Sequence, residues 1–308
     1  MKEVPEYKHN GLMVAVGMFD GMHRGHRYVV DRLRECARER GLGSGVVTFT
    51  AHPLAVIAPG SEPALLQPAR ERLAILRHSG VDRVIALDFT PALRALTARE
   101  FMLMLRRDYG VRAIFMGYDH RFGSDRITDP ARYEEIAAEL GIEIVRGAEA
   151  RLPEGHVSSS VVRRALSAGN VAEAAASLGR PYGITGTVGH GHRIGRTIGF
   201  PTANLVPEEP RQLIPAAGVY ACRATLDDGT VWPAMVNIGT RPTVDDGGRQ
   251  TVEAHLIGYE GDLYGRRLTL EFIARLRSER RFDTLEALSL QLAADRAATL
   301  QFVPRSFC

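Results

Sequence analysis

Cysteine is scarce in this sequence, and its three copies lie far apart. Cys36, Cys222 and Cys308 are odd in number and lack metal-ligand spacing, which excludes a disulfide framework and a cysteine zinc site. Scattered cysteines favour a reducing compartment. A long apolar run is also missing: Glu3 and Glu6 stand where a secretion signal needs one, and no stretch approaches the roughly 20 apolar residues of a bilayer span. We therefore expect a soluble, cytoplasmic protein with no membrane partner.

A concentrated positive charge is absent as well. The chain holds 39 lysine and arginine residues against 36 aspartate and glutamate residues, a net charge of +3. Acidic residues interrupt its arginine clusters, as in 277–281. A nucleic-acid-binding protein needs a basic stripe on one face, so we expect no nucleic-acid partner. The slight positive excess suits anionic small molecules, and a homo-oligomer is compatible with this composition.

The first part of the chain alternates strand-like and helix-like segments. A length of 308 residues exceeds the usual size of one domain. Short β-branched runs followed by amphipathic stretches predict βαβ units and a parallel sheet covered by helices on both faces. The expected strands are 12–17, 45–49, 84–87, 113–117 and 143–145, and the expected helices are 24–40, 69–78, 98–108 and 133–140.

After Pro181 the helical periodicity stops. Glycines become frequent, and runs of strand length follow at 183–188, 219–225, 231–238, 251–257 and 267–272. This pattern is typical of an antiparallel barrel or sandwich. One amphipathic helix, 284–300, comes last, with Asp283 as its expected N-cap. We therefore expect two domains, 1–181 and 182–308, with a boundary near Tyr182.

The segment after the first expected strand carries two histidines in a place suited to phosphate binding. It reads Gly17-Met18-Phe19-Asp20-Gly21-Met22-His23-Arg24-Gly25-His26 and opens the first helix. In a parallel sheet, ligands bind outside the carboxyl ends of the strands, and N–H groups at a helix start attract anions. The imidazoles can donate to phosphate oxygens, and Gly25 allows close approach. The alternative is that both histidines are plain surface residues of a helix start.

A second polar segment, Ser158-Ser159-Ser160, stands where a late strand should give way to a helix. Hydroxyl groups at a helix start cap it and can also reach phosphate, while Arg163 one turn later supplies a fixed cation. Taken alone, three serines in this position are most often simple caps.

A glycine-rich stretch opens the second part of the chain. It runs from Gly186 to Gly199 and leads into Phe200-Pro201-Thr202-Ala203-Asn204-Leu205. Backbone N–H groups of such a loop can face an anion, helped by Arg196, and the side-chain oxygens of Thr202 and Asn204 suit Mg²⁺ beside ATP phosphates. The alternative is a glycine-rich hairpin loop, with His190 and His192 as incidental surface residues.

Glu253 lies in an expected strand between small and apolar neighbours. A carboxylate is costly to bury without a task, so Glu253 is a candidate catalytic group. A structural salt bridge is the alternative.

Together these segments resemble the prokaryotic bifunctional riboflavin kinase/FAD synthetase family. The H-x-G-H of 23–26, the S-S-S-x-x-R of 158–163 and the segment 117–123 are similar to its FMN adenylyltransferase domain. The G-R-T-x-G-F-P-T-A-N-L stretch of 195–205 is similar to its riboflavin kinase domain. The resemblance spans nearly the whole chain. It implies an α/β Rossmann-like nucleotidyltransferase domain followed by a small all-β six-stranded barrel with a C-terminal helix.

The resemblance also implies the chemistry and the residues that perform it. One domain would phosphorylate riboflavin to FMN with ATP, and the other would adenylylate FMN to FAD, releasing pyrophosphate; Mg²⁺ is the implied cofactor. The implied catalytic residues are Glu253, His23 and His26. For adenylyl transfer, the implied ATP and phosphate ligands are Gly17, Phe19, Asp20, Gly21, His23, Gly25, His26, Ser159, Ser160 and Arg163, and the flavin ligands are Asp119, Arg121 and Phe122.

For the kinase, the implied ATP ligands are Gly186, Gly191, Gly195, Arg196, Pro201, Thr202 and Asn204, with Thr202 and Asn204 also at the metal. The implied flavin ligands there are Arg281, Phe282 and Leu285. His52 and His120 are interpreted as packing or loop residues instead of ligands.

Two other hypotheses stay open at this point. In one, the N-terminal domain has lost adenylyl transfer and only shapes the kinase. In the other, the chain is a non-catalytic flavin-binding or sensing protein. The intact adenylyltransferase motifs, His23, His26, Ser159, Ser160 and Arg163, argue against the first. Glu253 and the two phosphate loops argue against the second, because a protein that only binds flavin needs neither.

Overall fold

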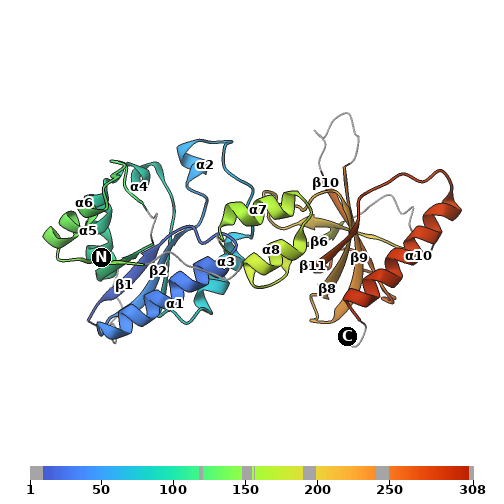
Figure 1. Cartoon of the computed structure of the whole chain (residues 1–308), viewed down its shortest axis with the longest axis horizontal. Helices are drawn as coiled ribbons and strands as arrows, with labels where there is room; N and C mark the ends of the chain where they lie inside the picture. Colours follow the sequence, from blue (N-terminus) through green and yellow to red (C-terminus); the bar gives the residue numbers. More distant parts are fainter. Residues whose placement is uncertain are drawn as a thin grey trace. The chain divides into compact units, whose positions relative to one another are not determined.

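The structure is a computed structural model that describes residues 10–117, 121–147, 155, 157–189, 199–240 and 250–304 (Figure 1). The chain forms two compact units, each described by itself. The first holds Met1–Pro63 and Ala69–Val157, and the second holds Ala64–Pro68 and Ser158–Cys308. Within the described ranges, none of the helices combines the length and apolar character that a bilayer span requires.

The first unit is built on a parallel sheet. Its strands are β1 (Leu12–Val16), β2 (Gly43–Phe49), β3 (Arg83–Leu87), β4 (Val111–Met116) and β5 (Glu143–Arg146). They lie in the order β3-β2-β1-β4-β5, with parallel pairing throughout. The order reverses between β1 and β4, and ligands of such sheets bind at the carboxyl ends of the strands beside this point. The predicted parallel α/β sheet is confirmed.

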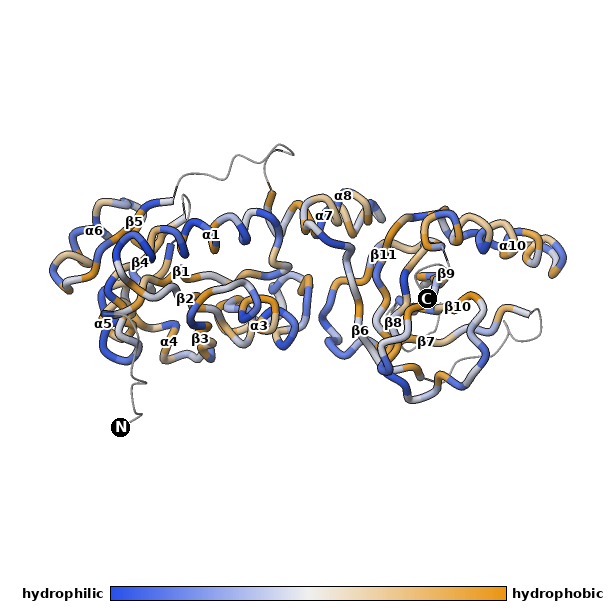
Figure 2. Tube along the Cα trace, turned by 90° about the horizontal axis from the view of Figure 1, so that it is seen from below, coloured by the Kyte–Doolittle hydropathy of each residue, from blue (hydrophilic) through white to orange (hydrophobic). Residues whose placement is uncertain are grey.

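Helices cover both faces of this sheet. They are α1 (Arg24–Glu39), α2 (Leu54–Ile57), α3 (Ala69–Arg77), α4 (Pro91–Ala95), α5 (Ala98–Tyr109) and α6 (Pro130–Glu139). Along β1, Leu12, Val14 and Val16 pack with α5 and α6, whereas Met13 and Ala15 pack with α1 and α3. The tube of α1 mixes hydrophilic and hydrophobic positions (Figure 2), as expected of a helix that buries one stripe. The sheet thus has two buried faces and an accessible carboxyl edge.

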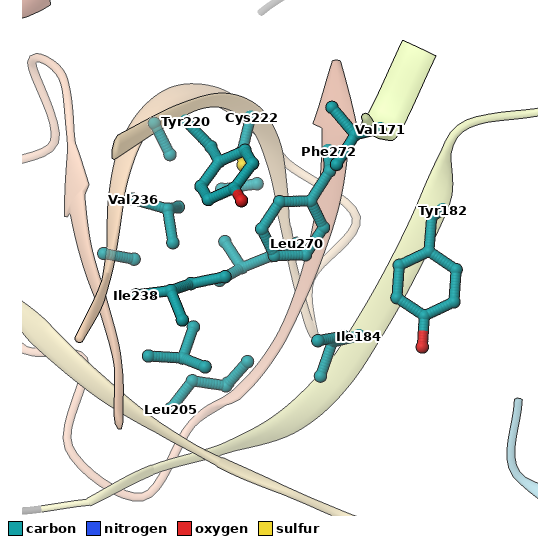
Figure 3. Packing of buried hydrophobic residues seen from close by; sticks show 14 of the residues in the cluster. Val171, Tyr182, Ile184, Leu205, Tyr220, Cys222, Val236, Ile238, Leu270 and Phe272 are labelled. Atoms are coloured by element: carbon teal, nitrogen blue, oxygen red, sulfur yellow. The ribbon is translucent and has the colours of Figure 1, made fainter. Parts of the chain in front are cut away.

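The second unit contains a closed antiparallel barrel. Its strands are β6 (Tyr182–Gly189), β7 (Ala203–Pro207), β8 (Gly218–Leu226), β9 (Val231–Thr240), β10 (Gln250–Leu256) and β11 (Arg267–Arg277), in the order β10-β7-β6-β11-β8-β9. Large residues fill its interior (Figure 3), where Tyr220 meets the ring of Phe272 edge-on at 5.4 Å. Helix α10 (Leu285–Phe302) packs against β8, β9 and β11. The predicted barrel with a C-terminal helix is confirmed.

The second unit begins before the barrel. Helices α7 (Ser159–Ser167) and α8 (Val171–Leu178) share the hydrophobic cluster of the barrel through residues such as Leu166 and Leu178. The compact unit therefore starts at Ser158, ahead of Tyr182.

The expected N-cap of the last helix is wrong. Thr284, and not Asp283, caps α10, because its extended backbone lets its hydroxyl accept a hydrogen bond from Ala287 N at 3.1 Å.

Replacing Leu166 with Ala should destabilise the barrel unit by about 2–5 kcal/mol, because the change leaves a cavity in a fully buried site. We expect riboflavin phosphorylation to be lost at a lower temperature, as measured by activity after heating. Arg164→Ala, on the exposed side of the same helix, is the matched control. An unchanged inactivation temperature for Leu166→Ala would show that α7 does not support the barrel.

Candidate active sites

The loop between β1 and α1 lies at the carboxyl edge of the sheet and is tightly held. Gly17 N donates to Val47 O at 3.0 Å, and the Thr48 hydroxyl donates to Met18 O at 3.1 Å. Phe19 and Met22 adopt left-handed backbone angles, with φ of 53° and 42°. Such conformations are costly for residues with a side chain, and they concentrate at functional sites.

Both histidines of the H-x-G-H segment lie together at the start of α1. His23 is the N-cap, and its Nδ1 accepts a hydrogen bond from His26 N at 3.3 Å. The two rings stack with centroids 3.6 Å apart. A Cβ on Gly25 would lie 3.1 Å from His23 Nδ1, so a larger residue there would crowd the pair. His23 is only 5% exposed, which does not fit a plain surface residue.

His26 is held in its neutral form. Burial, and to a lesser extent the proximity of His23, lower the pKa of His26 well below its usual value. Its Nδ1 atom is buried and has no hydrogen-bond partner among the described residues. A neutral imidazole carries one N–H, so the ring can donate one hydrogen bond to a ligand without bringing a charge.

A buried cation lies beside the same loop. Arg72 of α3 is fully buried, and its NH2 group donates to Phe49 O at the end of β2, at 2.5 Å. Its Nε and NH1 atoms have no hydrogen-bond partner within the described part of the chain. Burial lowers the pKa of Arg72, and the charge of Asp20, which is only 2% exposed, opposes that effect. The carboxylate of Asp20 therefore interacts electrostatically with the buried guanidinium of Arg72.

Arg72→Met should lower FAD formation about 10- to 100-fold, because small displacements of reacting groups have effects of that size. The midpoint of thermal unfolding should also fall, because the change removes the donor to Phe49 O and the cation near the buried Asp20. Both quantities are measured on one preparation. Arg70→Met, exposed on the same helix, is the control. Normal FAD formation in Arg72→Met would show that Arg72 has no role in adenylyl transfer.

An apolar cavity of about 600 Å³ opens in the first unit. Two of the expected flavin ligands, Arg121 and Phe122, line it, and Asp119 lies outside the described residues. The remaining lining is mostly aromatic or aliphatic and includes Phe49, Phe89, Phe101, Leu93 and Leu96. This volume and lining suit a flat aromatic ligand. His52 does not line the cavity: its Nδ1 accepts a hydrogen bond from Leu54 N at 3.2 Å.

The serine segment lies at the start of α7. Ser158 is the N-cap and accepts a hydrogen bond from Val161 N at 3.3 Å, while Ser159 and Ser160 form the first helical turn. Arg163 Nε donates to Ala64 O at 2.7 Å. These residues belong to the second unit and the histidines to the first, so their joint action on ATP stays a prediction.

The outer face of the barrel carries a polar row across three neighbouring strands. Asn204 of β7 lies opposite Glu253 of β10, and Glu253 lies opposite Asn237 of β9. Directly opposed residues on one face of an antiparallel pair have Cβ atoms about 4.5–5.5 Å apart. The carboxylate expected to act as base is therefore flanked by two amides.

This row borders a cavity of about 360 Å³ between the barrel and α10. Glu253, Asn237, Thr202 and His255 contribute polar groups to its wall. The apolar part of the wall consists of Phe200, Val219, Met235, Phe282, Leu288 and Leu292. His255 Nδ1 donates to Pro201 O at 2.9 Å, and burial lowers the pKa of His255. The wall of this cavity thus combines polar and apolar groups, and Arg277, Glu279 and Arg280 complete its lining.

Of the three expected flavin ligands of this unit, only Phe282 lines the cavity. Arg280 lies over its ring at 4.5 Å and Arg277 at 5.7 Å. Arg281 and Leu285 are exposed and are not among the lining residues. Their contact with flavin stays a prediction.

Thr202 also lines a second, smaller cavity of about 70 Å³, together with Pro201, Tyr259 and Tyr264. Gly191, Gly195 and Arg196 lie outside the described residues. Gly186 has a packing reason to lack a side chain, because a Cβ there would clash with the backbone of Val206. Its role at ATP stays a prediction.

The donors near Thr202 fit a metal held mainly by its substrate. Within the described ranges, no group of three His, Cys, Asp or Glu side chains gathers as a metal site. Mg²⁺ typically takes one or two protein oxygens and completes its shell with water and phosphate. Thr202 and Asn204 offer two such oxygens, two residues apart at the start of β7.

Comparison with known proteins agrees with two domains of different function. Residues 6–161 match the family model described as FAD synthetase, and residues 178–303 match the one described as riboflavin kinase. A bifunctional riboflavin kinase/FMN adenylyltransferase from Pseudomonas fluorescens is 41% identical over 292 residues, 94% of this chain and 93% of that protein. The same-named protein of Escherichia coli K12 is 40% identical over 295 residues, 95% of this chain and 93% of the relative.

A solved structure shares the fold over nearly the whole chain. A crystal structure described as a macrolide-efflux protein from Streptococcus pneumoniae has a TM-score of 0.84 and 31% identity, covering 96% of this chain and 95% of that one. With both family models and these relatives spanning nearly its whole length, the chain belongs to the bifunctional riboflavin kinase/FMN adenylyltransferase family, with the FAD synthetase domain N-terminal and the riboflavin kinase domain C-terminal.

Proposed function

We propose that the chain phosphorylates riboflavin to FMN at the outer face of its barrel and adenylylates FMN to FAD at the carboxyl edge of its parallel sheet. The observation that carries the proposal is the pairing, within each unit, of a cavity with an apolar wall and polar groups suited to phosphate chemistry. Both reactions consume ATP, and we propose a separate ATP site for each reaction.

In the kinase, Glu253 accepts the proton of the terminal riboflavin hydroxyl. The oxygen of that hydroxyl attacks the γ-phosphorus of ATP, and ADP leaves. Asn204, which lies opposite Glu253 on the neighbouring strand β7, orients its carboxylate. Thr202 lines both cavities of the barrel. We therefore place the meeting of acceptor and phosphate at Thr202, with Pro201 on the nucleotide side.

In adenylyl transfer, a phosphate oxygen of FMN attacks the α-phosphorus of ATP, and the bond to the β-phosphate breaks to release pyrophosphate. The neutral His26 and its neighbour His23 donate hydrogen bonds to the phosphate region, where charge accumulates. We assign Ser159, Ser160 and Arg163 to the leaving phosphates. The flavin ring occupies the cavity lined by Phe122.

We further propose Mg²⁺ as the metal of the kinase, held by Thr202 and Asn204. When bound there, it neutralises charge on the transferring phosphate. A cytoplasmic location, which rests on the scattered cysteines, and a functional boundary between 1–181 and 182–308 belong to the same proposal. A homo-oligomer is compatible with it.

One incubation tests the proposal. The purified full chain is mixed with riboflavin and Mg-ATP, and the flavins are separated by chromatography. We expect FMN to form first and FAD to follow. FMN alone would mean that the first unit does not transfer AMP, and unchanged riboflavin would contradict both assignments.

A further inference from the structure

The wall of the barrel cavity contains a second carboxylate that the proposed phosphoryl transfer does not use. Glu279 follows β11 and lines the same cavity as Glu253 and Asn237. No hydrogen bond or ion pair joins the side chain of Glu279 or of Asn237 to another residue within the described part of the chain, although Arg277 and Arg280 are close in sequence. A carboxylate and an amide that line a cavity without protein partners are available to a ligand.

Gly239 brings these two groups together. A Cβ on Gly239 would lie 2.5 Å from Glu279 Oε1 and 3.4 Å from Asn237 Nδ2, so both atoms lie next to the same point above β9. Asn237 and Gly239 are two residues apart and therefore face the same side of that strand. Glu253 is the cross-strand neighbour of Asn237. The acceptor of Glu279, the donor of Asn237 and the acceptor of Glu253 are thus neighbours in the lining of the cavity.

This order of groups suits a chain of hydroxyls. Each hydroxyl of a polyol both donates and accepts a hydrogen bond, so it can donate to a carboxylate and accept from an amide N–H. The apolar residues of the same lining, among them Val219, Met235 and Phe282, suit a ring. A molecule that carries both a ring and a polyol chain matches this mixed lining.

We infer that Glu279 and Asn237 bind the secondary hydroxyls of the ribityl chain and thereby place the terminal hydroxyl at Glu253. This inference rests on the proposed riboflavin kinase function. It assigns specificity for the polyol chain to two residues outside the phosphate-handling set, and it gives the absence of a side chain at position 239 a reason: a methyl group there would push Glu279 out of place.

The test compares two flavins at the kinase site of the full chain. Riboflavin carries the ribityl chain, whereas lumiflavin has the same ring with only a methyl group in its place. The KM for riboflavin and the inhibition constant of lumiflavin are both measured in the riboflavin phosphorylation assay, so flavin bound at the other unit does not enter. The variants are Glu279→Gln, Asn237→Ala and Gly239→Ala, with Glu286→Gln, an exposed carboxylate on α10 outside the cavity, as the control.

We expect the KM for riboflavin to rise about 10-fold in Asn237→Ala, which loses a hydrogen bond, and about 3- to 10-fold in Glu279→Gln, where a neutral acceptor replaces a charged one. Inhibition by lumiflavin should change less than about twofold, because its ring contacts remain. Gly239→Ala should behave like Glu279→Gln. Parallel weakening of both flavins, or no change in either, would overturn the inference. If wild-type protein failed to phosphorylate riboflavin at all, the proposed function itself would fall instead.

Discussion

Glu253→Gln should lower the rate of riboflavin phosphorylation about 100- to 10,000-fold, the usual contribution of a general base. The terminal hydroxyl of riboflavin is a weak nucleophile, and a carboxylate within hydrogen-bond reach both orients it and takes its proton. Glutamine keeps the size of the side chain and much of its hydrogen bonding but cannot accept the proton. The flanking Asn204 and Asn237 remain in register, so the geometry of the row should persist. Initial rates of FMN formation measure the effect.

The same variant carries its own control. FMN supplied directly should still become FAD, because that reaction uses the other unit. The KM for ATP should change little, since Thr202 and the nucleotide side are untouched. A wild-type rate of phosphorylation would remove Glu253 from the mechanism. Equal loss of both activities would indicate misfolding or obligatory coupling between the units.

The architecture of both units could be predicted because their strands bury apolar residues in simple patterns. All five residues of β1 are buried, and the run was recognisable as an interior parallel strand. Strand β7 was not expected as a strand. It is short, contains Asn204 and ends in Pro207, and its conformation comes from pairing with β6 and β10. Pairing of this kind depends on residues far away in the sequence.

The site was predictable where a local motif carried it, and not where tertiary packing did. His23, Gly25 and His26 are close in sequence and therefore necessarily close in space. Arg72 was missed, although one signal existed: it lies four residues before Leu76, so both share the buried face of α3. An arginine on that buried face implies an anionic neighbour. That neighbour, Asp20, is distant in sequence, and only the fold identifies it.

Asn237 and Glu279 illustrate the same limit. Neither belongs to a motif that suggests chemistry, and they come from different parts of the chain. The register of β9 against β10 and the close approach at Gly239 bring them beside Glu253. A prediction from sequence would have needed the register of these strands. A slip of one residue in the pairing would move every side chain of the strand to the other face.

His26→Ala should lower the conversion of FMN to FAD about 100- to 1,000-fold, the usual effect of removing a preorganised donor from a site of developing charge. The reaction is assayed with FMN and ATP, and riboflavin phosphorylation in the same preparation should stay near the wild-type rate. Since His26 is neutral in the folded protein, the variant removes a directed N–H and no charge. An unchanged rate of FAD formation would contradict a role for the H-x-G-H segment.

The depressed pKa of His26 adds a second readout with a definite sign. In the unfolded chain a histidine has a pKa of about 6.5. The imidazole of His26 therefore gains a proton more readily in the unfolded chain than in the folded one, where its pKa is lowered. The unfolded state therefore binds more protons below that pH, and the stability of the first unit should fall as the pH decreases from about 7 towards 5. Above about pH 7 this contribution is fully present. In His26→Ala the loss should be smaller, as measured by thermal unfolding at a series of pH values. An equally steep loss in the variant would mean that another group is responsible for the acid sensitivity of this unit.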